Sequence, residues 1–223
     1  DGADIKQRMN AGTTPLYIAC QQGHIECVRL LLEASAAVNQ AAGGGFSPLR
    51  IASQLGHLEI AQLLRDAGAD INQATQDGGT PLIIACQNER LEIARLLLKA
   101  GASVNQATNI GVTPLFMACQ HGHLKIARLL LEAGASVNQA RDDGTTPLYM
   151  ACQKDRLAIV RLLLKAGAAP DQAADDGATP LFVACYNGHL EVAKLLSSYG
   201  ASRAATPFGT PEAIANREGH ADL

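Results

Sequence analysis

The sequence predicts an all-α repeat solenoid built from stacked helix-turn-helix units, each completed by a loop or hairpin. The main observation is a Thr/Ser-Pro-Leu tripeptide that begins at residues 14, 47, 80, 113, 146 and 179, a constant spacing of 33 residues. A second observation is the Leu-rich segment with apolar residues at helical spacing that follows each tripeptide. A fixed period of this length is typical of arrays in which each unit packs only on its neighbours.

Residues 108–140 illustrate the elements of one unit. Thr113 is a good helix N-cap, and the proline after it suits the first helical position, so a short helix should begin there. Gly122 can adopt the left-handed conformation that ends helices. A second helix should begin near Leu124 and end at Gly134. The remaining residues are rich in Asn, Asp and Gly, which predicts an extended loop or hairpin.

The pattern G-x-TPL-x-x-A-x-x-x-GH-x-x-x-A-x-LLL-x-x-GA-x-VN closely resembles the ankyrin repeat and covers essentially the whole chain. The resemblance implies stacked helix pairs with projecting β-hairpin fingers, and a concave groove lined by the fingers and the first helices. We therefore expect one ankyrin-repeat domain over residues 1–223. Its expected units are 1–8 (the end of a preceding repeat), 9–41, 42–74, 75–107, 108–140, 141–173, 174–204 and the partial repeat 205–223. The incomplete units at both ends indicate a fragment of a longer array.

Charge and hydropathy narrow the class of partner. The chain has 18 Lys and Arg against 21 Asp and Glu, a net charge of -3, and no long block of either sign. This balance argues against nucleic acid or a membrane surface as a partner. No segment reaches the roughly 18 consecutive apolar residues of a membrane helix, and the first residues lack a signal-peptide pattern. We expect an intracellular protein, cytoplasmic or nuclear, that is monomeric as a fragment.

The cysteines support the same location. Five of them share one repeat position: Cys20, Cys86, Cys119, Cys152 and Cys185. Equivalent positions in packed helices lie roughly 8–10 Å apart, whereas a disulfide needs Cα atoms within about 7 Å. Free thiols indicate a reducing, intracellular compartment. Cys27 occupies the position of Ile60 in the next repeat, which predicts a small core residue.

Two inter-helix turns depart from the pattern. Most repeats have Gly-His there, but the third has Glu89-Arg90 and the fifth has Asp155-Arg156. A residue other than glycine costs about 1–2 kcal/mol in the left-handed conformation. We expect these two turns to be strained or to use a different geometry.

No residue pattern indicates catalysis, a metal site or a cofactor. One histidine per repeat occupies a matching position: His24, His57, His123, His189 and His220. Such residues are too far apart to share zinc, whose ligands lie about 2 Å from the ion, so each should order its own inter-helix turn. The glycines at 43–45 lack the Lys-Ser/Thr of a phosphate-binding loop. No set of nucleophile, base and orienting residue supports an enzyme.

The first helices carry the predicted partner-binding surface. The residue after each Thr/Ser-Pro-Leu is in turn Tyr17, Arg50, Ile83, Phe116, Tyr149 and Phe182, and four residues later come Gln21, Gln54, Gln87, Gln120, Gln153 and Tyr186. Residues four apart share one helix face, so each repeat sets a large side chain beside an amide or a second ring. Phe46 and Ile110 complete this groove stripe. We expect an extended peptide or a protein to bind it, because aromatic residues dominate binding hot spots.

The alternative interpretation is that the stripe residues pack between neighbouring first helices. If the stripe binds a ligand, the glutamine amides should hydrogen-bond its backbone. Acidic fingertips would favour a basic ligand residue, and they are Asp77, Asp142, Asp143, Asp175 and Asp176.

The leading hypothesis is therefore a non-catalytic protein-interaction module. One alternative is a regulatory or substrate-recruiting segment of a larger enzyme or channel. A further alternative makes the chain itself a substrate, because the segments around Asn105 and Asn138 look like the sites in ankyrin repeats that an asparaginyl hydroxylase modifies. This asparagine could instead order the finger of its repeat.

Overall fold

A computed structural model of the chain describes residues 12–220. These residues form two compact units, the first ending at Asn109 and the second beginning at Ile110. Both are built from helix pairs joined by loops, and no strand occurs between residues 12 and 220, so the predicted all-α repeat array is confirmed. The expected repeat end at residues 1–8 lies outside the described residues, and the expectation of one domain over 1–223 stays a prediction.

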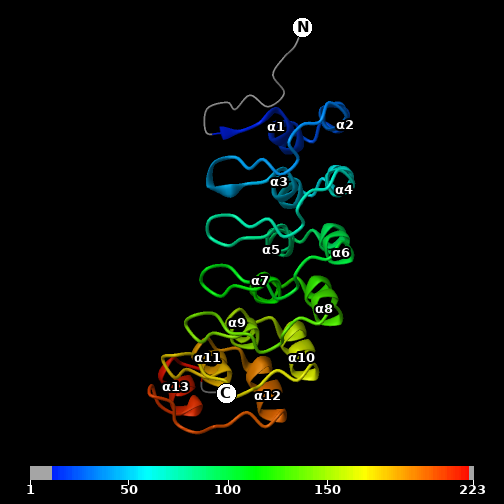
Figure 1. Cartoon of the computed structure of the whole chain (residues 1–223). Helices are drawn as coiled ribbons and strands as arrows, with labels where there is room; N and C mark the ends of the chain where they lie inside the picture. The colour runs from blue at the N-terminus through cyan, green and yellow to red at the C-terminus, as the bar shows by residue number, and fades with distance from the viewer. Residues whose placement is uncertain (1–11, 221–223) are drawn as a thin grey trace. The chain divides into compact units, whose positions relative to one another are not determined.

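The first unit contains three helix pairs and one 3-10 turn. Its helices are α1 (Pro15–Gln22), α2 (Ile25–Glu33), α3 (Pro48–Leu55), α4 (Leu58–Asp66), α5 (Pro81–Gln87) and α6 (Leu91–Lys99), with the turn η2 at Gly43–Gly45. Helices α1, α3 and α5 pack side by side in one row, and α2, α4 and α6 form a second row (Figure 1). The loops that join the pairs extend past the first row, away from the second.

The second unit repeats this arrangement. Its helices are α7 (Pro114–His121), α8 (Leu124–Glu132), α9 (Pro147–Gln153), α10 (Leu157–Lys165), α11 (Pro180–Tyr186), α12 (Leu190–Ser198) and α13 (Pro211–Arg217). Helices α7, α9, α11 and α13 form the row of first helices, and α8, α10 and α12 form the row of second helices. The bounds of α7 and α8 match the predicted helices, and Gly122 and Gly134 are left-handed with φ of 87°.

Each first helix starts at the predicted cap. The Thr or Ser hydroxyl accepts a hydrogen bond from the backbone N–H three residues later, as Thr113 Oγ1 does from Phe116 N at 3.1 Å. Proline occupies the first helical position, where no N–H is needed. The same cap recurs from α1 to α13 and fixes where every first helix begins.

The core consists of equivalent residues stacked from one repeat to the next. The leucine of the Thr/Ser-Pro-Leu tripeptide is buried in all six repeats that carry it. Second helices add fully buried leucines such as Leu64, Leu97 and Leu130. Full burial of a leucine side chain contributes about 1.5–3 kcal/mol. Alanines buried beside them, such as Ala94 and Ala127, let the helices approach closely.

Cys27 is exposed, so the prediction that it belongs to the core is wrong. Its counterpart Ile60 on α4 is buried, because α2 of the preceding repeat packs against α4. Cys27 lies on α2 itself, and no helix precedes this pair among the described residues. The position is therefore apolar in every repeat but is covered only where a described repeat comes before it.

The fingers are closed by tight turns instead of the β-hairpins that the resemblance implies. Thr75 N–H donates to the Gly79 carbonyl at 3.0 Å, and Arg141 N–H donates to the Thr145 carbonyl at 2.9 Å. Within residues 12–220, strand-type pairing is limited to two isolated bridges, Ala42 with Phe46 and Thr206 with Gly209.

In three repeats, the asparagine near the end of the repeat bonds to the following repeat. The Oδ1 atom of Asn72 accepts from Ser103 N at 2.8 Å, and its Nδ2 donates to the Gly101 carbonyl at 3.4 Å. Asn39 and Asn138 make the same two bonds. These asparagines therefore connect neighbouring repeats.

The inter-helix turns are partly as predicted. Glu89 and Asp155 are left-handed, with φ of 57° and 54°, which confirms that these turns carry backbone strain. Ser35 is also left-handed, at 61°, in the position that holds glycine in later repeats. The strain at Ser35 was not predicted from the sequence.

The residue after the turn contacts the preceding repeat. His189 Nε2 lies 3.2 Å from the Gln153 carbonyl at the end of α9, and Arg90 Nε donates to the Gln54 carbonyl at 3.1 Å. The expectation that each histidine orders its own turn was therefore wrong for His189. Arginine supplies the same N–H donor at the end of the preceding helix, where positive charge is favourable. In the third repeat, arginine can therefore take the place of histidine.

The left-handed positions generate a stability prediction. Ser35→Gly should raise the free energy of unfolding by about 0.5–1 kcal/mol, because glycine removes the steric cost at this φ. Gly68→Ala should lower the free energy of unfolding by about 1–2 kcal/mol. Nothing lies within 4 Å of the added Cβ, so the left-handed backbone conformation is the only source of this cost. Urea denaturation followed by circular dichroism would measure both, and a stabilised Gly68→Ala variant would contradict this account.

The connection between repeats generates a second prediction. Asn72→Ala should cost about 1–2 kcal/mol of stability, because two hydrogen bonds to the next repeat are lost. Asn72→Asp should cost less, since the carboxylate still accepts from Ser103 N–H. Gln62→Ala, an exposed change on α4, is the matched control in the same urea titration. Equal stability of all three variants would show that the bonds contribute nothing.

Candidate functional site

Burial divides the predicted groove stripe into two sets. Five members are buried: Tyr17, Ile83, Phe116, Tyr149 and Phe182. Exposed members are Phe46, Gln87, Ile110 and Tyr186, whereas Gln21, Arg50, Gln54, Gln120 and Gln153 are half-buried. Phe116 packs on Val112 and Met150, which shows what covers the buried set. Packing between neighbouring first helices, the alternative interpretation, describes these five side chains.

The structure brings Tyr149, Phe182 and Tyr186 together at one place in the second unit. Thr146 and Thr179 cap α9 and α11 and so fix Tyr149 and Phe182 in the first helical turns. Tyr186 lies one turn later on α11, and its ring stacks on that of Phe182 with centroids 6.3 Å apart.

Phe208 joins these rings from the last finger. Its ring centroid lies 5.3 Å from that of Phe182, tilted by 35°. The backbone of Thr206 is bonded to Gly209 in a tight turn, and Thr206 Oγ1 accepts from Phe208 N–H at 3.2 Å. Gly177 in the neighbouring finger allows the close approach, because a Cβ there would lie 2.7 Å from Pro207 Cγ.

The four rings border a cavity of about 270 Å³, which we term the aromatic cavity. Its lining residues are Tyr149, Gln153, Asp176, Ala178, Phe182, Val183, Tyr186, Asn187, Phe208 and Arg217. Tyr186 and Phe208 are 46% and 45% exposed, so their rings are open to a ligand. The sequence stripe included Tyr149, Gln153, Phe182 and Tyr186 but missed Phe208, Asn187 and Arg217. The prolines at residues 180 and 211 are 31 residues apart, so the last finger is two residues shorter than the others, and this irregularity with its Pro207-Phe208 pair was a signal in the sequence.

Carboxylates influence the tyrosine at the base of the cavity. Burial raises the pKa of Tyr149, and the negative charges of Asp176 and Asp143 raise it further. Asp176 Oδ1 accepts from Ala178 N–H at 2.9 Å, which holds the carboxylate at the fingertip. The cavity therefore combines apolar ring surface with negative charge at its edge.

In the first unit an arginine occupies the corresponding surface. The guanidinium carbon of Arg50 lies 4.4 Å from the centroid of the Phe46 ring, and its NH1 donates to Gln54 Oε1 at 3.2 Å. Burial lowers the pKa of Arg50, while the charges of Asp77 and Tyr17 oppose this shift. The predicted residues Tyr17, Phe46, Arg50 and Gln54 thus form one cluster whose cation belongs to the chain.

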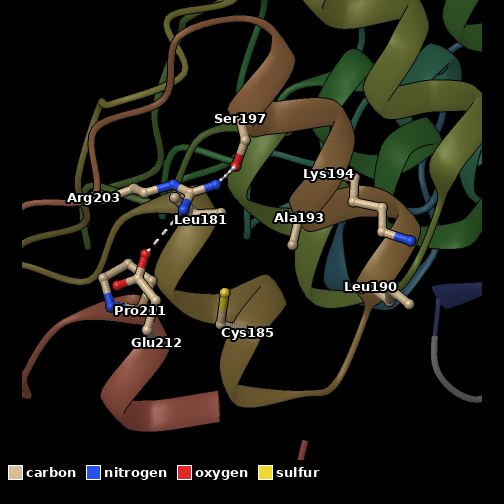
Figure 2. A pocket seen from close by; sticks show the side chains of 9 residues that line it. All are labelled: Leu181, Cys185, Leu190, Ala193, Lys194, Ser197, Arg203, Pro211 and Glu212. Carbon is tan, nitrogen blue, oxygen red and sulfur yellow. Dashed lines mark hydrogen bonds and ion pairs between the residues drawn. The ribbon is translucent and has the colours of Figure 1, made fainter. Parts of the chain in front are cut away.

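A second, smaller cavity lies among α11, α12 and α13 (Figure 2). It measures about 70 Å³, far below the roughly 300–1,000 Å³ of ligand pockets. Arg203 NH2 donates to Ser197 Oγ and Arg203 NH1 pairs with Glu212, both at 3.4 Å. Burial and the charge of Glu212 raise the pKa of the Cys185 thiol to about 11, with Arg203 opposing, so this thiol is not a nucleophile at neutral pH.

The two asparagines that are predicted modification sites differ in exposure. Asn138 is exposed and Asn105 is half-buried. Both nitrogen and oxygen of the Asn138 amide bond to the following repeat. Hydroxylation at either asparagine stays a prediction.

Histidine, cysteine and acidic side chains are spread along the repeats instead of being clustered. Between residues 12 and 220, no group of three His, Cys, Asp or Glu side chains could hold a metal ion. The rings of His121 and His123 stack with centroids 5.8 Å apart. None of the helices described here is long and apolar enough to cross a bilayer.

Capped first helices, buried leucine rows and side-chain bonds between neighbouring units define a helical repeat array. A family model described as ankyrin repeats (3 copies) matches residues 1–75, 67–141 and 136–206. The chain belongs to the ankyrin-repeat family. Among curated proteins, none matches the sequence. Ankyrin repeats are generally protein-interaction modules, and such domains are typically non-catalytic.

The buried thiols generate a pH prediction. Burial raises the pKa of Cys20 to about 12, so the folded chain holds this proton more tightly than the unfolded chain, where the pKa is about 8.5. Stability should therefore be complete below about pH 8.5 and fall as the pH rises toward 11 or 12. Cys185 contributes in the same direction.

Urea midpoints between pH 8 and 11 would measure this effect. The control replaces the five buried cysteines with serine, the residue that the second repeat already carries as Ser53, whose hydroxyl donates to the Leu49 carbonyl at 2.7 Å. The serine variant should lose less stability over this range. An equal loss in both proteins would assign the pH dependence to other groups.

Proposed function

We propose that this chain is a non-catalytic protein-interaction module that binds an extended polypeptide segment at the aromatic cavity. The observation that carries the proposal is the exposure of the Tyr186 and Phe208 rings, which stand beside the Phe182 ring around an open cavity. Exposed aromatic clusters of this kind supply hot spots in protein interfaces.

The size of the cavity favours a side chain of a larger partner over a free small molecule. Its volume of about 270 Å³ lies just below the range of small-molecule sites, which is about 300–1,000 Å³. The lining residues come from α9, α11, α13, two fingers and the turn after α11, so the cavity lies along the row of first helices. An extended segment could place one side chain there and continue along that row.

Polar groups near the cavity suit a polypeptide backbone. Gln153 is half-buried, and its side-chain amide makes no hydrogen bond within residues 12–220. An amide both donates and accepts, so it can bond to a peptide group of any sequence. Gln120 on α7 presents a similar unbonded amide among the described residues.

The buried residues of the groove stripe support the cavity instead of contacting the ligand extensively. Tyr149 and Phe182 line the cavity while being 8% exposed each, so they shape its floor and offer little area to a ligand. Tyr186, Phe46 and Ile110 stay as proposed contact residues because they are exposed. The wider alternative, a regulatory or substrate-recruiting segment of a larger enzyme or channel, would use the same surface.

Selection from a random peptide library displayed on phage would test the proposal. Peptides enriched on the wild-type chain should bind the Tyr186→Gln/Phe208→Ala variant more than tenfold more weakly, because hot-spot residues contribute about 2 kcal/mol or more. Glutamine is the residue that five other repeats carry at the position of Tyr186, so helix α11 should form normally.

Tyr199→Ala is the matched control, since Tyr199 is an exposed tyrosine outside the cavity lining. Fluorescence anisotropy would give the affinities, and circular dichroism would show that all three proteins are folded. Equal binding to wild type and double variant would exclude the cavity as the binding site.

A further inference from the structure

Two fingers bring carboxylates to the edge of the aromatic cavity. Asp175 N–H donates to the Asp143 carbonyl at 3.0 Å, so the finger at 141–145 lies against the finger at 174–178. Asp176 lines the cavity and is exposed. Its carboxylate has no ion-pair partner within the part of the chain that the structure describes.

The two arginines near the cavity, Arg141 and Arg217, are paired. Arg141 NH1 lies 3.4 Å from Asp143 Oδ2, and Arg217 Nε lies 3.0 Å from Glu218 Oε1. These two pairs are each neutral, although Arg217 also lines the cavity. Among the described residues that line the cavity, Asp176 is therefore a carboxylate without an ion-pair partner.

The first unit shows what an equivalent carboxylate does when a cation is present. Asp77 and Asp176 hold the same repeat position, three periods of 33 residues apart. The charge of Asp77 acts on Arg50, whose guanidinium lies over the Phe46 ring. Tyr149 stands in the repeat position of Arg50, so this position supplies no cation to Asp176. The arginine that lines the cavity, Arg217, is paired with Glu218.

We propose that the aromatic cavity takes a lysine or arginine side chain of an extended polypeptide. The cation would lie against the exposed rings of Tyr186 and Phe208 and pair with Asp176. The faces of aromatic rings attract cations, and the methylene groups of these side chains pack on apolar surface. This inference rests on the proposed function, since it names the chemistry of the ligand at the same cavity.

The raised pKa of Tyr149 agrees with this assignment. After burial, its largest causes are the charges of Asp176 and Asp143, so these carboxylates make the potential at Tyr149 more negative. A ligand cation enters such a potential favourably, whereas a ligand carboxylate is repelled.

The peptides enriched by the phage selection provide the first test. They should share one lysine or arginine flanked by apolar residues. Enrichment that depends on Tyr186 and Phe208 but shows no shared basic residue would overturn this inference and leave the proposed function standing. Enrichment that ignores both rings would overturn the two together.

A double-mutant cycle on one enriched peptide provides the second test. Asp176→Asn retains the acceptor for Ala178 N–H and removes only the charge, and replacement of the peptide lysine by norleucine removes only the cation. Each change should weaken binding roughly two- to fivefold, as expected for a cation at a partly exposed ring and carboxylate. The two losses should not add, because they remove the same interaction.

Asp66→Asn is the matched control, since Asp66 is an exposed carboxylate on α4 of the first unit. It should bind the peptide as wild type does. Affinity that is unchanged by Asp176→Asn, or losses that add fully, would overturn the assignment of the cation to this carboxylate.

Discussion

A helix pair of this chain can bury its apolar side chains only against the next pair. Two short helices of seven to nine residues enclose no core by themselves, so the leucine and alanine rows of one repeat need the rows of its neighbour. Within each unit this requirement sets the two rows of helices, places the residue after Thr/Ser-Pro-Leu at a repeat boundary, and leaves the fingers outside the core. The proposed binding surface is therefore made by residues that are not buried between repeats.

Stacking also explains how far the sequence could predict the site. Helix starts and ends were predictable because caps, prolines and glycines act locally, as at Thr113 and Gly122. The burial of Tyr149 and Phe182 was not, because the face that looks free on one helix is covered by the neighbouring first helix and finger. Phe208 was missed because its place depends on a loop conformation that no periodic pattern encodes. Cys27 was predicted to be buried, but a residue at this repeat position is covered only by a preceding helix pair. No helix pair precedes α1 and α2 among the described residues.

The same repeat position serves different purposes along the chain. Where the first unit has Arg50 between Phe46 and Asp77, the second unit has Tyr149 near Asp176. In the first arrangement the chain itself supplies the cation at this position, whereas in the second the position holds a tyrosine and Asp176 has no ion-pair partner among the described residues. An array of this kind can keep its scaffold constant while changing one side chain per repeat, so that neighbouring repeats offer different chemistry to a ligand.

The bonds between repeats run in both chain directions. Asn72 reaches forward to Ser103, and Arg90 reaches back to the end of α3. Each repeat thus carries one half of the junction before it and one half of the junction after it. Duplication or deletion of a whole 33-residue segment recreates the same partners at the new boundary, whereas a change of any other length separates them. Gene rearrangement can therefore alter the number of repeats in one step, without a new interface having to evolve.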